Sequence, residues 1–527
     1  MVIRRSFSKL QLLTEPPLPG VLLAAIAGVV VLWFVADVVI SVVFLSNVSH
    51  VSGAWMVLAR DLASGTFYRP LFDPLVGYGG TRFMPVFFSL HALLIWFGCA
   101  IIPSGMALSL VSGVLLVAAV VALLKRRGVS RLTVLLAVAA LLSFVRVRAG
   151  FTSIRGDLLP VAFALWGAWF FLGARSTDRV AGRRDGALFA AGLLFALAFL
   201  TKITSLFAFA AAVSAALLAA ISTPTSRRRE LSDALVTAAG FVLTAAVGLV
   251  LTNVLSAGTF LETFRTSATG GADDLTIWSI LRDGLGAFRW QWRSNQVSFR
   301  VLLIVSLALA VRQAWFLRHR GRQPLVFECL LVLYSGAGVV AILSSPGAEG
   351  NHLVDLMVAG VLFVAVGIEG MTARSGGTRF SGRVAPVMLA GIALLSMRTN
   401  VPILFDREDQ RPKLDSLADV MHSDHLVLSE NPTFLIYAGK EARILDAFML
   451  RIIRDRDAAV SEQFLSEIRR GAFDLALVYE PDEEIDARVL ESVHFGPGFR
   501  EELAASYERQ GKFGTTAIYR PTDIRRE

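Results

Sequence analysis

The sequence has few charged residues and almost no cysteine. Only 18% of its 527 residues are Asp, Glu, Lys or Arg, whereas 55% are apolar, and this balance excludes an ordinary water-soluble enzyme of this length. The two cysteines, Cys99 and Cys329, show no spacing typical of a metal or redox site, so we expect free, buried thiols. No small-residue cleavage site follows the basic N-terminus, so we expect the first apolar segment to remain as a helix. The composition predicts a polytopic membrane protein.

The net charge of +9 does not by itself indicate nucleic-acid binding. The arginines and lysines lie in short clusters between apolar segments, a pattern typical of the cytoplasmic loops of membrane proteins. We therefore predict no nucleic-acid partner, membrane lipids as the surroundings, and a multi-pass protein of the plasma (inner) membrane with a cytoplasmic N-terminus.

The positions of these basic clusters predict the topology. Placing every cluster in the cytoplasm gives about eleven spans, and it places two long loops, residues 46–103 and 258–298, outside. Residues 84–102 are predicted to form a juxtamembrane helix, because a full crossing would place Lys125–Arg127 outside. The spans are expected at 19–45, 105–124, 132–147, 158–172, 187–221 (two spans with a turn near Lys202), 231–256, 299–317, 325–345, 353–371 and 384–404.

The composition changes after residue 404. Residues 405–527 are charged throughout and contain no apolar run long enough to span a membrane. Short apolar runs predict strands at 425–429, 473–479 and 515–519, with helices at 431–437 and 460–470. We predict a mainly α fold, in which a transmembrane domain (1–404) carries a small extracytoplasmic α/β domain (405–527) that caps it or helps to hold a partner.

The first outside loop contains three candidate bases. Asp61, Asp73 or His50 could take a proton from an acceptor hydroxyl. Each also has a simpler interpretation: Asp61 could pair with a neighbouring arginine, Asp73 could start a turn before Pro74, and His50 could be an ordinary interfacial histidine. The sequence leaves these alternatives open.

Ionisable residues at the outer ends of spans predict a phosphate site. Such residues are costly near lipid and are therefore functional candidates. Guanidinium and ammonium groups suit phosphate oxygens, whereas Asp157 could hold a metal, orient a base, or cap its helix and pair with Arg155. The candidate phosphate-binding residues are Arg82, Arg148, Arg155 and Lys202, and Asn351 and His352 are candidate substrate contacts, although Lys202 could reach toward the surface and the last two could be loop residues.

Several motifs resemble those of a known family. They are Tyr78–Pro85 (YGGTRFMP) before an apolar helix, Arg155–Leu159 (RGDLL), Ala198–Thr204 (AFLTKIT) and Asn351–Asp355 (NHLVD). In the tail, Leu428–Pro432 (LSENP) with Ala438–Lys440 and Asp446–Phe448 adds to the pattern. In order and topology these pieces resemble the GT-C superfamily of membrane glycosyltransferases, especially the ArnT-like, protein-mannosyltransferase-like and Rgt-like bacterial proteins.

The resemblance implies transfer of a hexosyl or pentosyl group from a polyprenyl-phosphate donor to a glycan, lipid or protein acceptor outside the membrane, with inversion. It also implies a first-loop aspartate as base, and basic groups or a divalent cation such as Mg²⁺ or Mn²⁺ at the departing phosphate. Where the family usually has an acidic residue, this chain has Ser49–Gly53 (SHVSG). Asp61, Asp73 or His50 then takes this role, or the protein is a non-catalytic relative. A transporter or flippase of lipid-linked precursors is the alternative from another class, and it would have its polar residues near the membrane midplane.

Overall fold

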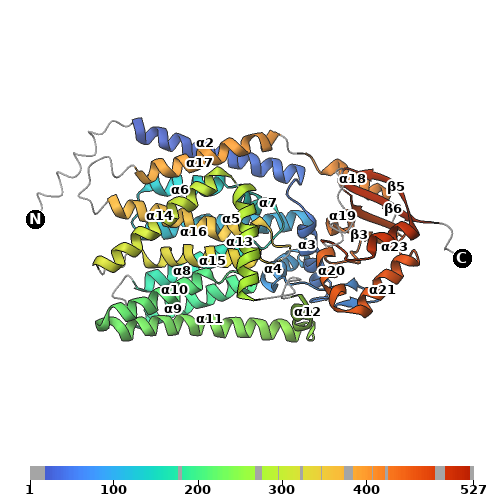
Figure 1. The fold of residues 1–527 in the computed structure, drawn as a ribbon, viewed down its shortest axis with the longest axis horizontal. Coiled ribbons are helices and arrows are strands. Elements are labelled where there is room, and N and C mark those ends of the chain that lie inside the picture. The colour runs from blue at the N-terminus through green and yellow to red at the C-terminus, as the bar shows by residue number, and fades with distance from the viewer. Residues whose placement is uncertain are drawn as a thin grey trace, which may run out of the picture.

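The computed structural model describes residues 18–175, 181–267, 276–294, 296–320, 325–345, 347–372, 384–405, 408–421, 425–480 and 493–522. Figure 1 shows two parts, a bundle of helices that run along the long axis of the molecule and a mixed α/β domain at one end of that bundle. The bundle consists of α2 (Leu18–Phe44), α5 (Ile101–Arg126), α6 (Arg131–Ser143), α7 (Val145–Thr152), α8 (Leu158–Arg175), α9 (Ala181–Thr201), α10 (Phe207–Ser222), α11 (Arg227–Leu255), α14 (Val297–Arg320), α15 (Val326–Leu343), α16 (Leu353–Thr372) and α17 (Val384–Phe405).

Among the described residues, eight helices are long and apolar enough to cross a membrane, or nine if α6 and α7, which meet at 76°, form one broken span. Two further apolar helices, α10 and α17, lie where the sequence predicts spans. The mainly α, polytopic architecture is thus confirmed, and the number eleven stays a prediction. Within the predicted outside loop, α4 (Pro85–Trp96) has only 12 residues, about 18 Å of helix, too short to cross a bilayer.

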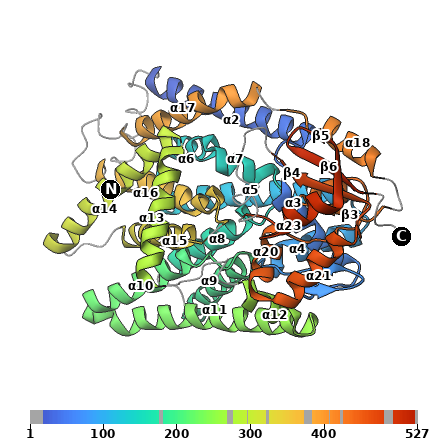
Figure 2. The same ribbon diagram turned by 45° about the vertical axis from the view of Figure 1, so that its right-hand side comes forward.

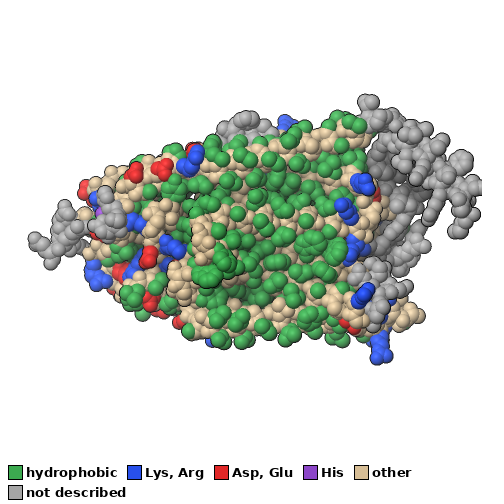
Figure 3. Space-filling model, turned by 180° about the vertical axis from the view of Figure 1, so that it is seen from behind, with side chains coloured by type: hydrophobic (Ala, Val, Ile, Leu, Met, Phe, Trp, Pro, Cys, Tyr) green, Lys and Arg blue, Asp and Glu red, His purple; other side chains and the backbone are tan. Residues whose placement is uncertain are grey.

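Small residues allow the bundle helices to approach closely. A Cβ atom on Gly192 of α9 would lie 2.2 Å from the Thr237 carbonyl oxygen, and one on Gly240 of α11 would lie 2.6 Å from the Phe189 carbonyl oxygen. In a lipid bilayer the hydrophobic effect does not drive helices together, and close backbone contacts of this kind allow them to associate. The face of the bundle drawn in Figure 3 carries a broad hydrophobic belt. Lys and Arg gather at the end of this belt away from the α/β domain, and charges of both signs lie at the other end.

A layer of shorter elements lies between the bundle and the α/β domain. It consists of α3 (His50–Ala63), the antiparallel pair β1 (Phe72–Asp73) and β2 (Gly77–Tyr78), α4, α12 (Thr259–Ser267) and the short 3-10 helix η3 (Gly350–His352). A second 3-10 turn, η2 (Pro224–Ser226), precedes α11. The predicted loop 258–298 is largely helical, because α13 (Ile277–Ser294) follows α12 and crosses the bundle helices steeply (Figures 1 and 2). Trp278 and Trp290 on α13 are 80% and 62% exposed, which agrees with the interfacial anchoring that tryptophan favours.

The C-terminal domain contains a four-stranded sheet in the order β3-β4-β6-β5. Strands β3 and β4 are parallel, with Val427 opposite Leu475, whereas β4–β6 and β6–β5 are antiparallel. The predicted strands and helices correspond to β3, β4, β6, α19 and α21. The elements are α18 (Arg411–Val420), β3 (Val427–Ser429), α19 (Pro432–Tyr437), α20 (Ala447–Arg456), α21 (Ala458–Arg469), β4 (Leu475–Tyr479), α23 (Phe499–Ser506), β5 (Tyr507–Phe513) and β6 (Thr516–Pro521).

The first loop (residues 46–103), which the sequence predicts to lie outside, shares backbone and core contacts with the C-terminal domain. Tyr78 of β2 forms a parallel bridge with Ile444, since the Tyr78 amide donates to the Arg443 carbonyl (2.7 Å) and the Leu445 amide donates to the Tyr78 carbonyl (3.0 Å). One buried apolar cluster contains Trp55 and Phe88 of the loop as well as residues of α18, α19 and β4. Figure 2 shows α20 beside α12, so the second predicted loop (residues 258–298) also contacts this domain. The domain is therefore fixed on the end of the bundle.

Candidate active site

A cavity of about 540 Å³ lies where the bundle, the first loop and the C-terminal domain meet. Its walls come from α3, from Ile280 of α13, from the C-terminal domain, and from segments at residues 81–84, 155–157, 201–204 and 341–352. Its polar and aromatic lining includes His50, Trp55, Thr81, Arg82, Arg155, Asp157, Lys202, Ser345, Glu349, Asn351, His352, Asp446, Phe448 and His494. Seven of the predicted site residues thus face one cavity: His50, Arg82, Arg155, Asp157, Lys202, Asn351 and His352.

Asp157 lies at the centre of the polar part of this cavity. Its Oδ1 accepts hydrogen bonds from Lys202 Nζ and Asn351 Nδ2, both at 2.8 Å, and its Oδ2 lies 3.1 Å from Arg155 Nε. Burial alone would raise the pKa of Asp157, but the charges of Lys202 and Arg155 and the hydrogen bonds lower it well below its usual range. Asp157 is therefore a carboxylate at neutral pH, and it joins three turns of the bundle.

The cationic side chains of the cavity differ in the groups that they contact. Lys202 and Arg155 pair with Asp157, and Arg155 also lies 3.3 Å from Glu349. Arg82 contacts neutral groups, Ser345 Oγ at 3.5 Å and the Phe448 ring at 5.8 Å. Burial lowers the pKa of Arg82, and Asp446 opposes this shift, so the guanidinium stays charged at neutral pH. Arg82 is thus well placed to meet an incoming anion.

Asn351 and His352 present further polar atoms. They form the 3-10 turn before α16. Asn351 Oδ1 and His352 Nδ1 are buried and have no hydrogen-bond partner within the described part of the chain. Because a buried polar atom without a partner costs free energy, both atoms suit a ligand with hydroxyl groups.

Of the three predicted bases, only His50 lines the cavity. Burial lowers the pKa of His50, against the attraction of Asp446, so its ring is neutral at pH 7. Asp61 is buried elsewhere, where both of its oxygens accept from Arg69, at 2.6 and 2.9 Å. Arg69 also donates to the Val76 and Ala442 carbonyls. Pairing with a nearby arginine, the simpler interpretation of Asp61, is what the structure contains.

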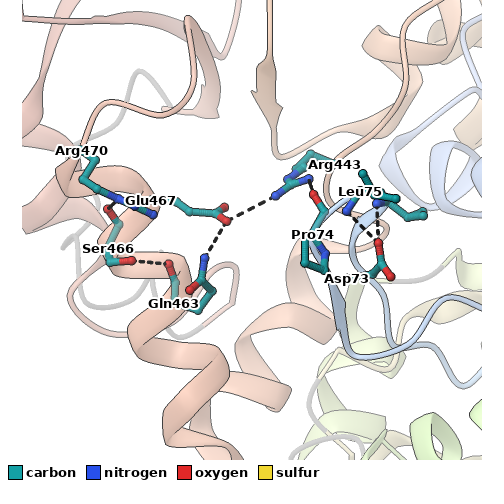
Figure 4. Close-up of polar contacts among 9 residues, drawn as sticks. Asp73, Pro74, Leu75, Arg443, Gln463, Ser466, Glu467 and Arg470 are labelled. Carbon is teal, nitrogen blue, oxygen red and sulfur yellow. Dashed lines mark hydrogen bonds and ion pairs between the residues drawn. The ribbon is translucent and has the colours of Figure 1, made fainter. Parts of the chain in front are cut away.

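Asp73 forms a turn on the surface of the first loop. Its Oδ1 accepts from the amides of Leu75 (2.7 Å) and Val76 (2.9 Å), and these bonds lower the pKa of Asp73. Figure 4 shows this turn beside Arg443, which donates to the Pro74 carbonyl and pairs with Glu467 of α21 at 3.3 Å. Asp73 starts a turn, as its simpler interpretation has it, and this turn also contacts the C-terminal domain through Arg443. Asp73 does not line the cavity.

Arg148 does not line the cavity either. It is buried in α7, where its Nη1 lies 2.7 Å from Asp37 Oδ2 of α2 and its guanidinium lies 4.0 Å from the Trp33 ring. The Arg148 guanidinium therefore lies in the interior of the bundle and not at the predicted phosphate site.

The residues around Asp157 do not suit the expected Mg²⁺ or Mn²⁺. No group of three or more His, Cys, Asp or Glu side chains within the described residues could hold a metal ion. The oxygens of Asp157 already face an ammonium, a guanidinium and an amide N–H, which would repel a divalent cation. The positive charges next to Asp157 are those of Lys202 and Arg155.

Sequence reasoning missed the part of the site that the C-terminal domain supplies. Asp446, Phe448 and His494 line the cavity. Asp446 caps α20 by accepting from the amides of Phe448 and Met449. In the sequence, Asp446 stands out only as part of a motif that resembles the GT-C family. No neighbouring residue pattern points to His494.

Comparison with solved structures shows which known fold this chain has. An oligosaccharyltransferase from Archaeoglobus fulgidus, in the apo form, aligns with a TM-score of 0.57 and 11% identity over 94% of this chain and 74% of that chain. ArnT from Cupriavidus metallidurans bound to undecaprenyl phosphate aligns with a TM-score of 0.51 and 14% identity over 97% and 99%. The archaeal oligosaccharyltransferase AglB from Archaeoglobus fulgidus, with an inhibitory peptide and a dolichol-phosphate, aligns with a TM-score of 0.51 and 11% identity over 93% and 74%. The fold is that of a GT-C membrane glycosyltransferase, as the sequence motifs predict.

A sequence-family model defines the family. Residues 83–346, half of the chain, match glycosyltransferase family 87. The chain belongs to this family and is a membrane glycosyltransferase. No curated protein matched the sequence significantly.

Proposed function

We propose that this glycosyltransferase moves a sugar from a polyprenyl-phosphate donor to an acceptor outside the cytoplasm, with inversion at the anomeric carbon. The observation that carries this proposal is a single cavity in which Arg82, Arg155 and Lys202 lie beside apolar side chains of the bundle such as Ile203 and Ile342. A lipid phosphate presents this same combination of a charged head and a hydrocarbon chain.

In the proposed reaction the acceptor oxygen attacks the anomeric carbon on the face opposite the phosphate. The bond from that carbon to the phosphate oxygen breaks, and its electron pair leaves with the polyprenyl phosphate. Arg82 and Lys202 stabilise the negative charge that develops there, because fixed cations in a partly dry site act more strongly than cations in water. Asp157 holds Lys202 and Arg155 in place, so this environment exists before the donor binds.

Asp157 acts as this anchor rather than as the base. Its pKa is low, and its oxygens already accept from Lys202 and Asn351, so it has little tendency to take a proton. The base therefore comes from another wall of the cavity.

The proposed sidedness places the cavity and the C-terminal domain outside. Basic residues lie at the opposite ends of the helices: Lys125 and Arg126 end α5, Arg175 ends α8 and Arg227 begins α11. The positive-inside rule places these ends in the cytoplasm. Glycan, lipid and protein acceptors would all reach the cavity from the outer side.

Binding of undecaprenyl phosphate to the purified protein in nanodiscs tests the proposal. Native mass spectrometry would compare this lipid with undecaprenol, which lacks the phosphate. We expect a preference for the phosphate that falls about tenfold or more in Arg82→Ala and in Lys202→Met, since bonds to charged groups are the strong ones. Arg509→Ala, on an exposed strand of the C-terminal domain, is the matched control.

An assay of sugar transfer completes this test. Undecaprenyl-phosphate-linked hexoses and pentoses would be supplied with membrane extract, and the anomeric configuration of the product would be read by NMR. An equal affinity of the wild type for undecaprenol and undecaprenyl phosphate would overturn the donor site. Movement of the lipid across liposomes without bond cleavage would favour a flippase instead.

A further inference from the structure

A third histidine lies beside His50 in the cavity, in addition to His352. His494, from the C-terminal domain, lines the cavity, and its ring centre lies 5.6 Å from that of His50 at an interplanar angle of 65°. The two imidazoles come from distant parts of the chain, so the domain interface brings them together. Glu430 lies behind His494. The other charged or titratable groups on the cavity walls are Arg82, Arg155, Asp157, Lys202, Glu349, His352 and Asp446.

Glu430 fixes the orientation of His494. This buried carboxylate directly follows β3, where its backbone amide continues the ladder by donating to the Leu477 carbonyl (3.0 Å). Its Oε2 accepts from the Tyr479 amide, and its Oε1 is hydrogen-bonded to His494 Nδ1. A carboxylate oxygen accepts hydrogen bonds, so His494 Nδ1 donates in this contact and Nε2 is the ring nitrogen that remains to accept a proton.

This arrangement is that of an imidazole base with a carboxylate behind it. Such a carboxylate holds the tautomer and stabilises the imidazolium that forms when the ring takes a proton. His50 has no such support among its described hydrogen bonds, and burial lowers its pKa. Of the two imidazoles, His494 is therefore better suited to accept a proton.

We propose that His494 is the general base of the transfer and that Glu430 is its positioning residue, so that the C-terminal domain completes the active site. This inference rests on the proposed function. As the acceptor oxygen bonds to the anomeric carbon, its proton passes to His494 Nε2, while the electron pair of the breaking bond leaves on the polyprenyl phosphate. The imidazolium then returns its proton to water. His50 lies beside the acceptor and contributes to its placement.

Three variants test the proposal with the donor that the wild type consumes. We expect His494→Gln to lower kcat about 100-fold or more, the range of general base catalysis, with undecaprenyl phosphate binding within twofold of the wild type. His50→Gln should mainly raise KM. His425→Gln, in the same domain but outside the cavity, is the control and should leave turnover unchanged.

Glu430→Gln tests the positioning role through the pH profile. Without the carboxylate the imidazolium is less stable, so the acid limb of kcat/KM should move to lower pH, which a purely structural defect would not cause. The double variant His494→Gln/Glu430→Gln should be no slower than His494→Gln. Unfolding temperature and undecaprenyl phosphate binding report whether each variant is folded.

The outcomes separate the two proposals. A wild type that binds no undecaprenyl phosphate overturns the proposed function itself. A wild type that binds and transfers, together with a His494→Gln variant that turns over within about threefold of it, overturns the role of His494. Loss of kcat in His50→Gln with an unchanged acid limb in Glu430→Gln assigns the base to His50 and overturns the inference as well.

Discussion

Lys202 Nζ lies 2.8 Å from Asp157 Oδ1, and both side chains are largely buried. Lys202 lies in the turn between α9 and α10, whereas Asp157 lies in the turn before α8. Asn351, in the turn before α16, contacts the same carboxylate oxygen. One acidic side chain therefore sets the relative positions of three turns, and the shape of the cavity depends on it.

The first prediction concerns this carboxylate. In Asp157→Asn, Lys202 and Arg155 lose the charge that holds them, and each leaves the position that the donor phosphate needs. We expect kcat/KM to fall about 100-fold, as for the loss of one preorganised electrostatic group. Lys202→Met should cause a similar loss.

A double-mutant cycle provides the control for this prediction. If Asp157 acts through Lys202, the double variant should lose much less than the product of the two single losses. Fully multiplicative losses, measured as donor turnover, would show that the two residues act independently and would contradict the anchoring role.

The second prediction is the pH dependence of the same ion pair. The pKa of Asp157 is lower in the folded protein than in the unfolded chain, so its contribution to stability is complete above the ordinary aspartate pKa of about 3.9 and is lost as the pH falls further. The Tm difference between the wild type and Asp157→Asn should stay constant from about pH 8 to pH 5 and shrink only below about pH 4. Calorimetry in detergent would measure it, and a difference that disappears between pH 7 and pH 5 would refute the assignment.

The sequence predicted the membrane side of the site better than the outer side. Lys202 and Asp157 could be found because ionisable residues at the ends of apolar spans are costly and hence conspicuous. Asp61 looked equally conspicuous, but its bidentate partner Arg69 could be recognised only once the loop had folded. His494 carries no local signal, because its partner Glu430 and its neighbour His50 are distant in the chain. The strand β5 was missed since its sequence, YERQGKF, is polar and mostly exposed at a sheet edge.

The third prediction is that Asp61 is structural. Asp61→Asn breaks a buried, bidentate ion pair. The charged Arg69 guanidinium, which lies between the first loop and the C-terminal domain, then loses the carboxylate that neutralises it. Breaking such a pair costs about 3–5 kcal/mol, so the apparent Tm should fall and the C-terminal domain should become more sensitive to proteases. Asp409→Asn, which removes the exposed partner of Arg411, should change neither. An Asp61→Asn variant with normal stability but no turnover would restore Asp61 as a candidate base.

The fourth prediction concerns Asp73. Asp73→Ala removes two hydrogen bonds of an exposed turn, so we expect turnover within about twofold of the wild type and at most a small fall in Tm. Arg443→Met instead removes the contacts of Arg443 to the Pro74 carbonyl and to Glu467, and it should lower the Tm more than Asp73→Ala does. Complete loss of turnover in Asp73→Ala, with the protein still folded, would show that the carboxylate reaches the substrate.

The last prediction tests whether the C-terminal domain must be seated on the first loop for activity. A Cβ atom on Gly53 of α3 would lie 2.5 Å from the Thr433 amide nitrogen of α19, whereas one on Gly28 of α2 would meet nothing within 4 Å. Gly53→Val should therefore push α19 away from α3 at a cost of about 1–3 kcal/mol, while Gly28→Val is the control in another helix. Because His494 and Asp446 line the cavity from the displaced domain, turnover should fall more than undecaprenyl phosphate binding does. Equal losses of both, measured on the same folded sample, would indicate that the cavity as a whole had collapsed and that the domain makes no separate contribution to the chemistry.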